Sequence, residues 1–159
     1  RFQHKGTVRG VDVFDDYGHH PTEIEAVLKA FREKYGDRRL VVAFQPHRFS
    51  RTKLCWEQFL SCFALADQVY LTDIYAAGED PMAGVDSDHM IGDIKARGLV
   101  PREGISRIDS KQGLTPRMSD VAKQLAAVLN PGDALFTLGA GDIFKLSTAV
   151  VEALNEARK

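Results

Sequence analysis

The sequence is poor in cysteine, in net charge and in long apolar runs, and each shortage excludes a class of protein. Its two cysteines, Cys55 and Cys62, fall on one predicted helix, where their separation spans about 10 Å, too far for a disulfide. We therefore expect a protein of the reducing cytoplasm. No apolar run approaches the roughly 20 residues of a membrane span. The formal net charge of −1 gives no electrostatic reason to bind nucleic acid or an anionic membrane.

Common nucleotide-binding and catalytic motifs are also missing. Lys145 lacks the preceding glycine and the spacing of a Walker phosphate loop. Gly139-Ala140-Gly141-Asp142 starts like a dinucleotide fingerprint, but Phe144 stands where the third glycine is needed. That turn fits either a close backbone approach to a ligand or simple tight-turn geometry. The sequence has no Gly-x-Ser-x-Gly elbow and no cysteine beside a base, so covalent catalysis has no candidate residue.

The composition is that of an ordinary globular domain. With 44% hydrophobic and 27% charged residues, 159 residues can bury one core but not two comfortable ones. We therefore predict a single domain over residues 1–159. Because the chain opens at Arg1 on a charged, linker-like segment without an initiator methionine, we expect it to be a piece of a longer protein.

Apolar patterns of strand and helix type alternate along the chain. This order predicts an α/β fold with a Rossmann-like, open and mostly parallel sheet and helices on both faces. The predicted strands are 40–44, 68–72, 105–108 and 134–138, and residues 7–14 are predicted to supply one or two more. The predicted helices are 24–35, 51–66, 87–98 with Ser87 as its cap, 115–128 and 143–154. Residues 73–85 carry too many glycines and prolines for an element and suggest a functional flap.

Polar residues follow each predicted strand. Parallel strands bring their carboxyl ends to the same edge of a sheet, where open α/β folds bind ligands. We therefore expect the chemistry at the edge formed by five segments, which are 15–20, 45–51, 73–79, 109–111 and 139–142.

Residues 15–23 read Asp-Asp-Tyr-Gly-His-His-Pro-Thr-Glu and place carboxylates, a phenol and imidazoles at one strand-to-helix turn. Pro21 suits the first helical position and holds His20 extended, so neighbouring amides are expected to point outward, where an anion could dock. Turn and capping chemistry accounts for the same residues equally well. The spacing alone does not separate these two interpretations.

A second dense stretch, 44–52, reads Phe-Gln-Pro-His-Arg-Phe-Ser-Arg-Thr. Arg48 and Arg51, three residues apart at a helix start, can present two planar guanidiniums to one carboxylate or phosphate. A pair of solvated arginines would give the same pattern. We favour a ligand because cations at a helix start oppose the helix dipole.

Histidine and aspartate recur near this edge, which raises a metal-dependent phosphoesterase as a rival hypothesis. The residues concerned are His19, His20, His47, His89, Asp15, Asp16 and Asp73. Two adjacent arginines would repel a cation, so we predict no metal site in this chain.

Together with Ile74-Tyr75-Ala76-Ala77-Gly78-Glu79 and Leu138-Gly139-Ala140-Gly141-Asp142, the stretches 15–23 and 44–52 closely resemble the carboxyl-terminal domain of the Mur ligases. The resemblance runs from Arg1 almost to the end of the chain. It implies that an N-terminal UDP-binding domain and a central ATP-binding domain are absent from this chain. It also implies ATP-dependent peptide bond formation in bacterial peptidoglycan synthesis, joining L-alanine to UDP-N-acetylmuramate through an acyl phosphate.

The resemblance also implies roles for individual residues. Those expected to bind L-alanine are Tyr17, His19, Arg48 and Arg51. Those expected to contact ATP are Arg1 and Asp16, and supporting roles fall to His20, His47, Gly139 and Asp142. Mg²⁺ would be held mainly by the central domain, so this chain alone is expected to fold without turning over substrate. Two further hypotheses stay open, which are a related ligase that recycles murein peptides and a plain nucleotide-binding module.

Overall fold

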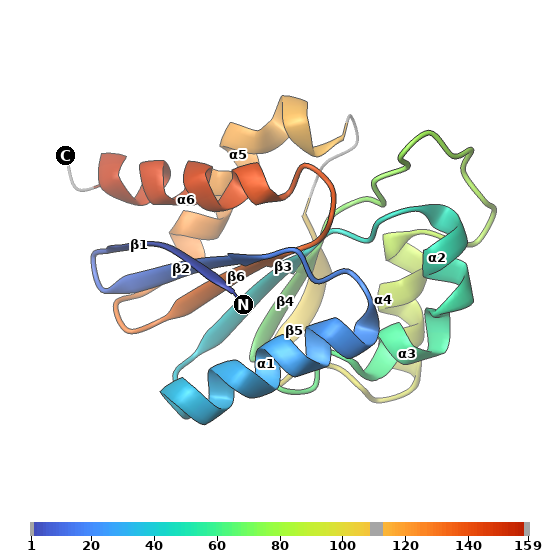
Figure 1. Cartoon of the computed structure of the whole chain (residues 1–159), viewed down its shortest axis with the longest axis horizontal. Coiled ribbons are helices and arrows are strands. Elements are labelled where there is room, and N and C mark those ends of the chain that lie inside the picture. Colours follow the sequence, from blue (N-terminus) through green and yellow to red (C-terminus); the bar gives the residue numbers. More distant parts are fainter. Residues whose placement is uncertain (1, 109–112, 158–159) are drawn as a thin grey trace.

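The computed structural model describes residues 2–108 and 113–157 and has a six-stranded sheet between two layers of helices (Figure 1). The strand order is β1-β2-β6-β3-β4-β5, and β1 pairs antiparallel with β2 while the other pairs are parallel. The strands are β1 Gln3–Val8, β2 Val11–Asp16, β3 Leu40–Phe44, β4 Gln68–Leu71, β5 Gly104–Arg107 and β6 Ala134–Leu138. The helices are α1 Pro21–Tyr35, α2 Phe49–Leu54, α3 Trp56–Ser61, α4 Ser87–Ala96, α5 Leu114–Val128 and α6 Phe144–Glu156. The predicted fold class is confirmed.

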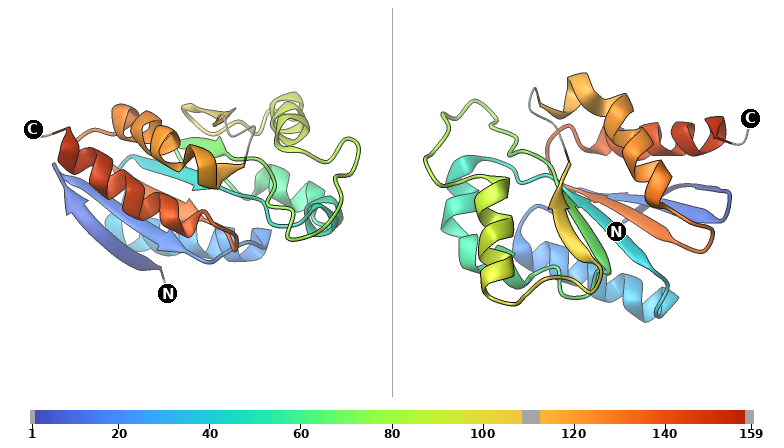
Figure 2. Two further views of the ribbon diagram at one scale, coloured as in Figure 1. Left: turned by 90° about the horizontal axis from the view of Figure 1, so that it is seen from above. Right: turned by 180° about the vertical axis from the view of Figure 1, so that it is seen from behind.

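The two faces of the sheet are covered by different helices (Figure 2). Helices α1, α3 and α4 pack on one face, and α5 and α6 pack on the other. Strands β3 and β6 are buried along their whole length because both faces are covered, which explains their continuous apolar runs. Among the described residues, no helix is long and apolar enough to cross a membrane.

An aromatic cluster fixes how β2 lies against β6. The ring of Phe14 stacks on that of Phe136 with centroids 5.0 Å apart, and Phe31 of α1 meets Phe136 edge-on at 5.8 Å. Phe2 adds edge contacts to Phe14 and Phe136 at 5.4 and 5.1 Å. Aromatic pairs in these geometries contribute roughly 0.5–1.5 kcal/mol each beyond area burial. The cluster therefore helps fix the register of β2 against β6, in which the last residues of the two strands are paired.

Two local predictions were wrong. The helix expected over 51–66 is two helices, because Cys55 leaves helical geometry at φ −102° and ψ 18° and both ends one helix and begins the next. Cys55 and Cys62 are buried, and they form no disulfide, as predicted. Helix α4 is capped by Asp86, whose carboxylate accepts from the amide of His89 at 2.8 Å. Ser87 cannot serve as the cap because its buried hydroxyl donates to the carbonyl of Thr72.

The strand order creates a divergence at the carboxyl edge of the sheet. Strand β6 lies between β2 and β3, and the helix that follows β6 covers the opposite face from those that follow β2 and β3. The chain therefore leaves neighbouring strands in opposite directions, the arrangement at which open α/β sheets form ligand crevices.

Candidate functional site

The turn between β2 and α1 is held by its own side chains. The buried Asp16 carboxylate accepts from the amide of Gly18 at 2.8 Å. His20 is extended, at φ −89° and ψ 142°, and its Nδ1 accepts from the amide of Thr22 at 3.1 Å. Glu23 Oε1 accepts from the amides of His19 and His20 at 3.2 and 3.0 Å. The prediction that these amides are open to an anion was therefore wrong, because a capping box occupies them.

The second stretch lies against this turn. The rings of His19 and His47 are 6.1 Å apart between centroids, and His20 Nε2 lies 3.7 Å from Cys55 Sγ. Arg51 Nη1 lies 3.3 Å from His47 Nδ1, so Arg51 reaches the same corner. We call this group the cationic corner, and it consists of His19, His20, His47, Arg48 and Arg51. The two motifs, separated in sequence by all of α1 and β3, meet in space as predicted.

The charge of the cationic corner suits a small anion. Burial, with a further contribution from the Arg51 guanidinium, lowers the pKa of His47. A neutral His47 presents Nδ1 as an acceptor, which matches the donor geometry of Arg51. The side chain of Arg48 is exposed, and that of Arg51 is partly buried. The structure thus places one guanidinium, that of Arg51, directly beside His47, while Arg48 contacts the neighbouring elements through its backbone.

A third segment, the turn 139–142 between β6 and α6, is tied to the end of β3 by Gln45. The buried Gln45 amide donates to Asp142 Oδ1 at 2.8 Å, and its Oε1 accepts from the amide of Ile143 at 3.2 Å. A Cβ on Gly139 would lie 2.9 Å from the Gln45 carbonyl oxygen, and one on Gly141 would lie 2.5 Å from Gln45 Oε1. The close approaches that these glycines permit are therefore to Gln45 of the same chain and, at Gly141, also to the Tyr75 ring at 2.7 Å. The sequence placed Gln45 at this edge but gave it no role, although a glutamine directly after a buried strand was a visible signal.

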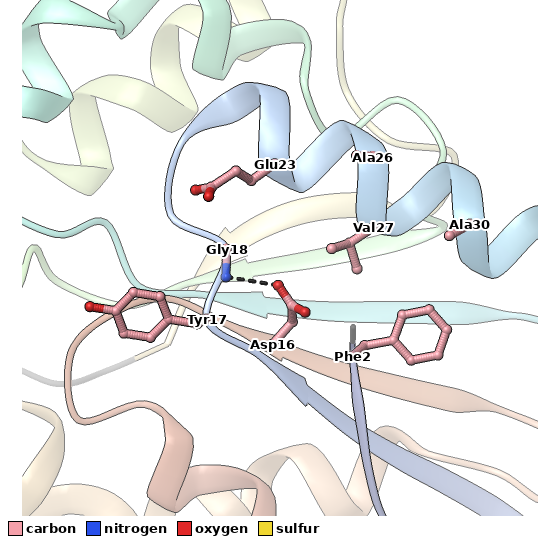
Figure 3. Close-up of a pocket in the computed structure, with 8 residues that line it drawn as sticks. All are labelled: Phe2, Asp16, Tyr17, Gly18, Glu23, Ala26, Val27 and Ala30. Carbon is pink, nitrogen blue, oxygen red and sulfur yellow. Dashed lines mark hydrogen bonds between the residues drawn. The ribbon is translucent and has the colours of Figure 1, made fainter.

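Asp16 lines a hollow beside the cationic corner (Figure 3). Helix α1 contributes an apolar wall of small side chains, and the acids Asp16 and Glu23 stand near one end of it. The residues that line the hollow are Phe2, Asp16, Tyr17, Gly18, Glu23, Ala26, Val27 and Ala30. The Tyr17 ring points away from the Asp16 carboxylate and packs edge-on against His19 at 5.4 Å. Asp16, predicted for ATP, and Tyr17 and His19, predicted for L-alanine, thus point to two sides of one turn.

The remaining predicted residues fall elsewhere. Arg1 and the segment 109–111 lie outside the described residues. Asp142 bonds Gln45 and the hydroxyl of Thr115, so it joins the edge to the start of α5. His89 of α4 is exposed and pairs with Asp86, the residue that caps this helix. Across residues 2–108 and 113–157, no group of three or more histidine, cysteine or acidic side chains is placed to hold a metal ion.

The lowered pKa of His47 predicts an acid-sensitive contribution to stability. A folded-state pKa below the usual 6.5 means that the unfolded chain takes up the proton first, so stability is lost as pH falls from about 6.5 through the folded pKa. We expect His47→Gln to lose less free energy of unfolding than the unsubstituted chain between pH 7.5 and 5.5 in urea titrations. Glutamine keeps an acceptor for Arg51 but cannot take up the proton.

His89 provides the control of opposite sign. Its hydrogen bond to Asp86 raises its pKa, so its contribution is present below pH 6.5 and is lost as pH rises through the folded pKa. His89→Gln should therefore remove a small stabilisation at low pH. If both variants shifted the pH profile in the same direction, the assignment for His47 would be contradicted.

The comparisons with known proteins favour the Mur ligase resemblance over the phosphoesterase hypothesis. Residues 1–141 match the family described as "Mur ligase, glutamate ligase domain". The UDP-N-acetylmuramate–L-alanine ligase of Bdellovibrio bacteriovorus is 46% identical over 157 residues, covering 97% of this chain and 31% of that protein. The enzyme of the same name from Geobacter sulfurreducens is 43% identical over 159 residues, covering 100% of this chain and 32% of that protein. The chain thus spans about a third of the length of these curated relatives.

Solved structures share the fold. The UDP-N-acetylmuramate–alanine ligase of Thermotoga maritima superposes with a TM-score of 0.70 at 24% identity, covering 99% of this chain and 30% of that one. The MurF ligase of the same organism, solved in complex with ADP, gives 0.61 at 18% identity, with coverage of 99% and 31%. The family match over residues 1–141 and the fold together lead to one conclusion: this chain belongs to the Mur ligase, glutamate ligase domain family.

Proposed function

We propose that this chain is the carboxyl-terminal domain of a bacterial cytoplasmic ligase that joins L-alanine to UDP-N-acetylmuramate at the expense of ATP. The observation that carries the proposal is the cationic corner, in which His19 and Arg51 from separate motifs both lie against His47. The name shared by relatives at 43–46% identity supports the choice of substrates. The coverage of about a third supports a domain arrangement in which UDP-binding and ATP-binding domains precede this one.

The role of the cationic corner is to hold the amino acid. Arg48, Arg51 and His19 bind the carboxylate of L-alanine, and Tyr17 flanks its methyl group. Charge-assisted bonds from two guanidiniums fix both the position and the rotation of a carboxylate, which leaves the amine free to point away. Orientation of this kind contributes to the rate because the attack becomes effectively unimolecular.

The hollow beside the corner supports the second part of the proposal. Asp16, with Arg1, contacts ATP when the domains close, while His20, His47, Gly139 and Asp142 support the edge. The γ-phosphoryl group passes to the muramate carboxylate, and the amine of L-alanine then attacks the acyl phosphate and releases phosphate. Mg²⁺ would neutralise phosphate charge during this transfer. The cationic corner does not suit Mg²⁺, so we place the metal in the central domain.

The test is reconstitution with the two upstream domains of the same gene. We expect phosphate release from ATP that requires both UDP-N-acetylmuramate and L-alanine, and no release from this chain alone. The assay is colorimetric phosphate detection with each substrate omitted in turn. Release that required a murein peptide in place of L-alanine would identify the recycling ligase, and release without any acceptor would contradict the ligase assignment.

A further inference from the structure

The loop that connects β4 to α4 is attached to the cationic corner at two points. At the first, Tyr75 pairs with the residues that flank His47. The Tyr75 amide donates to the Pro46 carbonyl, and its carbonyl accepts from the Arg48 amide, both at 2.8 Å. The rings of Tyr75 and His47 also stack, with centroids 5.5 Å apart and planes 10° from parallel. The loop therefore forms part of the wall of the corner.

The second attachment is Glu79. Its Oε1 accepts from the amide of Ser50 at 3.0 Å, and its Oε2 accepts from the Ser50 hydroxyl. These bonds lower the pKa of Glu79, so it is ionised at neutral pH. Because both carboxylate oxygens of Glu79 accept hydrogen bonds from Ser50, Glu79 has a structural contact rather than a ligand-binding one.

Between these two attachments stands a strained residue. Arg48 has φ 72° and ψ 140°, a region that L-residues with side chains rarely occupy. The Arg48 amide donates to the Tyr75 carbonyl. The Arg48 carbonyl accepts from the amide and the hydroxyl of Thr52 at 3.2 and 2.7 Å. Strained backbone of this kind persists only where the surroundings over-determine it, and it gathers at functional sites.

We propose that Glu79 is a positioning residue for amino-acid binding: by fixing Ser50 at the first turn of α2, it holds the Arg48 backbone in its left-handed conformation and so keeps Arg48 and Arg51 on the same ligand. The inference rests on the proposed function of the cationic corner. Arg48 lies two residues before Ser50 and Arg51 one residue after it, so both arginines move with the backbone that Glu79 holds. Losing Glu79 frees the backbone to relax at Arg48, which turns one guanidinium away.

The experiment uses the reconstituted full-length protein and measures KM and kcat for L-alanine and for ATP. We expect Glu79→Ala to raise the KM for L-alanine about tenfold and to leave the KM for ATP within about twofold, since one charge-assisted contact is weakened. Glu79→Gln keeps acceptor and donor atoms for Ser50 and should recover most of the loss. Glu57→Ala, at an exposed ion pair with Arg97, is the matched acidic control and should change neither constant.

A double-mutant cycle separates positioning from general damage. If Glu79 acts through Arg48, Glu79→Ala added to Arg48→Ala should raise the KM for L-alanine by less than about threefold further. Full additivity, or an equal rise in both KM values, would overturn the inference. Failure of Glu79→Gln to rescue would do the same, because it would indicate a direct charge contact with the amine.

Failure of the underlying function gives a different result. If Arg48→Ala and Arg51→Ala leave the KM for L-alanine unchanged, the cationic corner does not bind the amino acid and both proposals fall. If the arginine variants raise that KM and Glu79→Ala does not, the role of Glu79 alone is wrong. Comparing the Tm of Arg48→Gly with that of Arg48→Ala tests the backbone strain independently of enzyme activity. The glycine variant should have the higher Tm, because glycine adopts a positive φ without strain. Equal Tm values would contradict the strained conformation.

Discussion

Replacing Arg51 with alanine in the full-length protein is expected to raise the KM for L-alanine about 100-fold. The guanidinium of Arg51 reaches the same corner as His19 and His47, and removing one charged partner of a bound carboxylate costs about 3 kcal/mol. Under the proposed function Arg51 contacts only the carboxylate of L-alanine, so the KM for ATP should stay within about twofold. Steady-state phosphate release over a range of L-alanine concentrations gives both constants.

Lys53→Ala is the matched control for Arg51→Ala. Lys53 lies on the same short helix, α2, and carries the same charge, but it is exposed and stands outside the cationic corner. We expect a change of less than about twofold, as for an ordinary surface substitution. A similar rise in both variants would mean that the effect comes from overall charge or from α2 folding. An unchanged constant in Arg51→Ala would remove Arg51 from the site.

The elements that the sequence predicted best are those buried on both faces. Strands β3 and β6 have the predicted bounds because continuous apolar runs identify a central strand without any tertiary information. The meeting of residues 15–23 with 44–52 was also predictable, because both follow parallel strands and parallel strands end at one edge. The break at Cys55 was not predictable from periodicity, because α2 buries only Thr52 and so has no apolar stripe whose interruption could mark the break.

Glu79 and Gln45 were placed at this edge from the sequence, but their roles were missed because those roles depend on contacts between distant segments of the chain. Glu79 and Gln45 look like ordinary polar loop residues until the fold places Ser50 and Ile143 within their reach. Glu23 is different, since a glutamate three residues after a cap is a recognised signal for a capping box. The outward-pointing amides were predicted because Pro21 was given weight and Glu23 was not.

These observations divide the carboxyl edge into two structural parts. Gln45 locks the turn 139–142 to the end of β3, and Glu79 locks the loop after β4 to the start of α2. Both attachments flank the segment 46–48, whose residues His47 and Arg48 belong to the cationic corner. Loss of either attachment should therefore weaken the corner, but only the Gln45 attachment is buried in the core. Loss of the Gln45 attachment should therefore appear mainly as a lower free energy of unfolding.

Gly139→Ala is expected to cost about 3 kcal/mol in the free energy of unfolding, which corresponds to a fall of roughly 6–12 °C in Tm. Gly139 has φ +148°, and an added Cβ would lie 2.9 Å from both the Gln45 carbonyl oxygen and Ile143 Cγ2. The oxygen belongs to backbone at the end of a buried strand and cannot move aside. Gly36→Ala, at φ +67° with open space around it, is the control and should cost only about 1 kcal/mol. Equal losses in thermal melts of the two variants would show that backbone conformation alone, and not the contact with Gln45, makes glycine necessary at the edge.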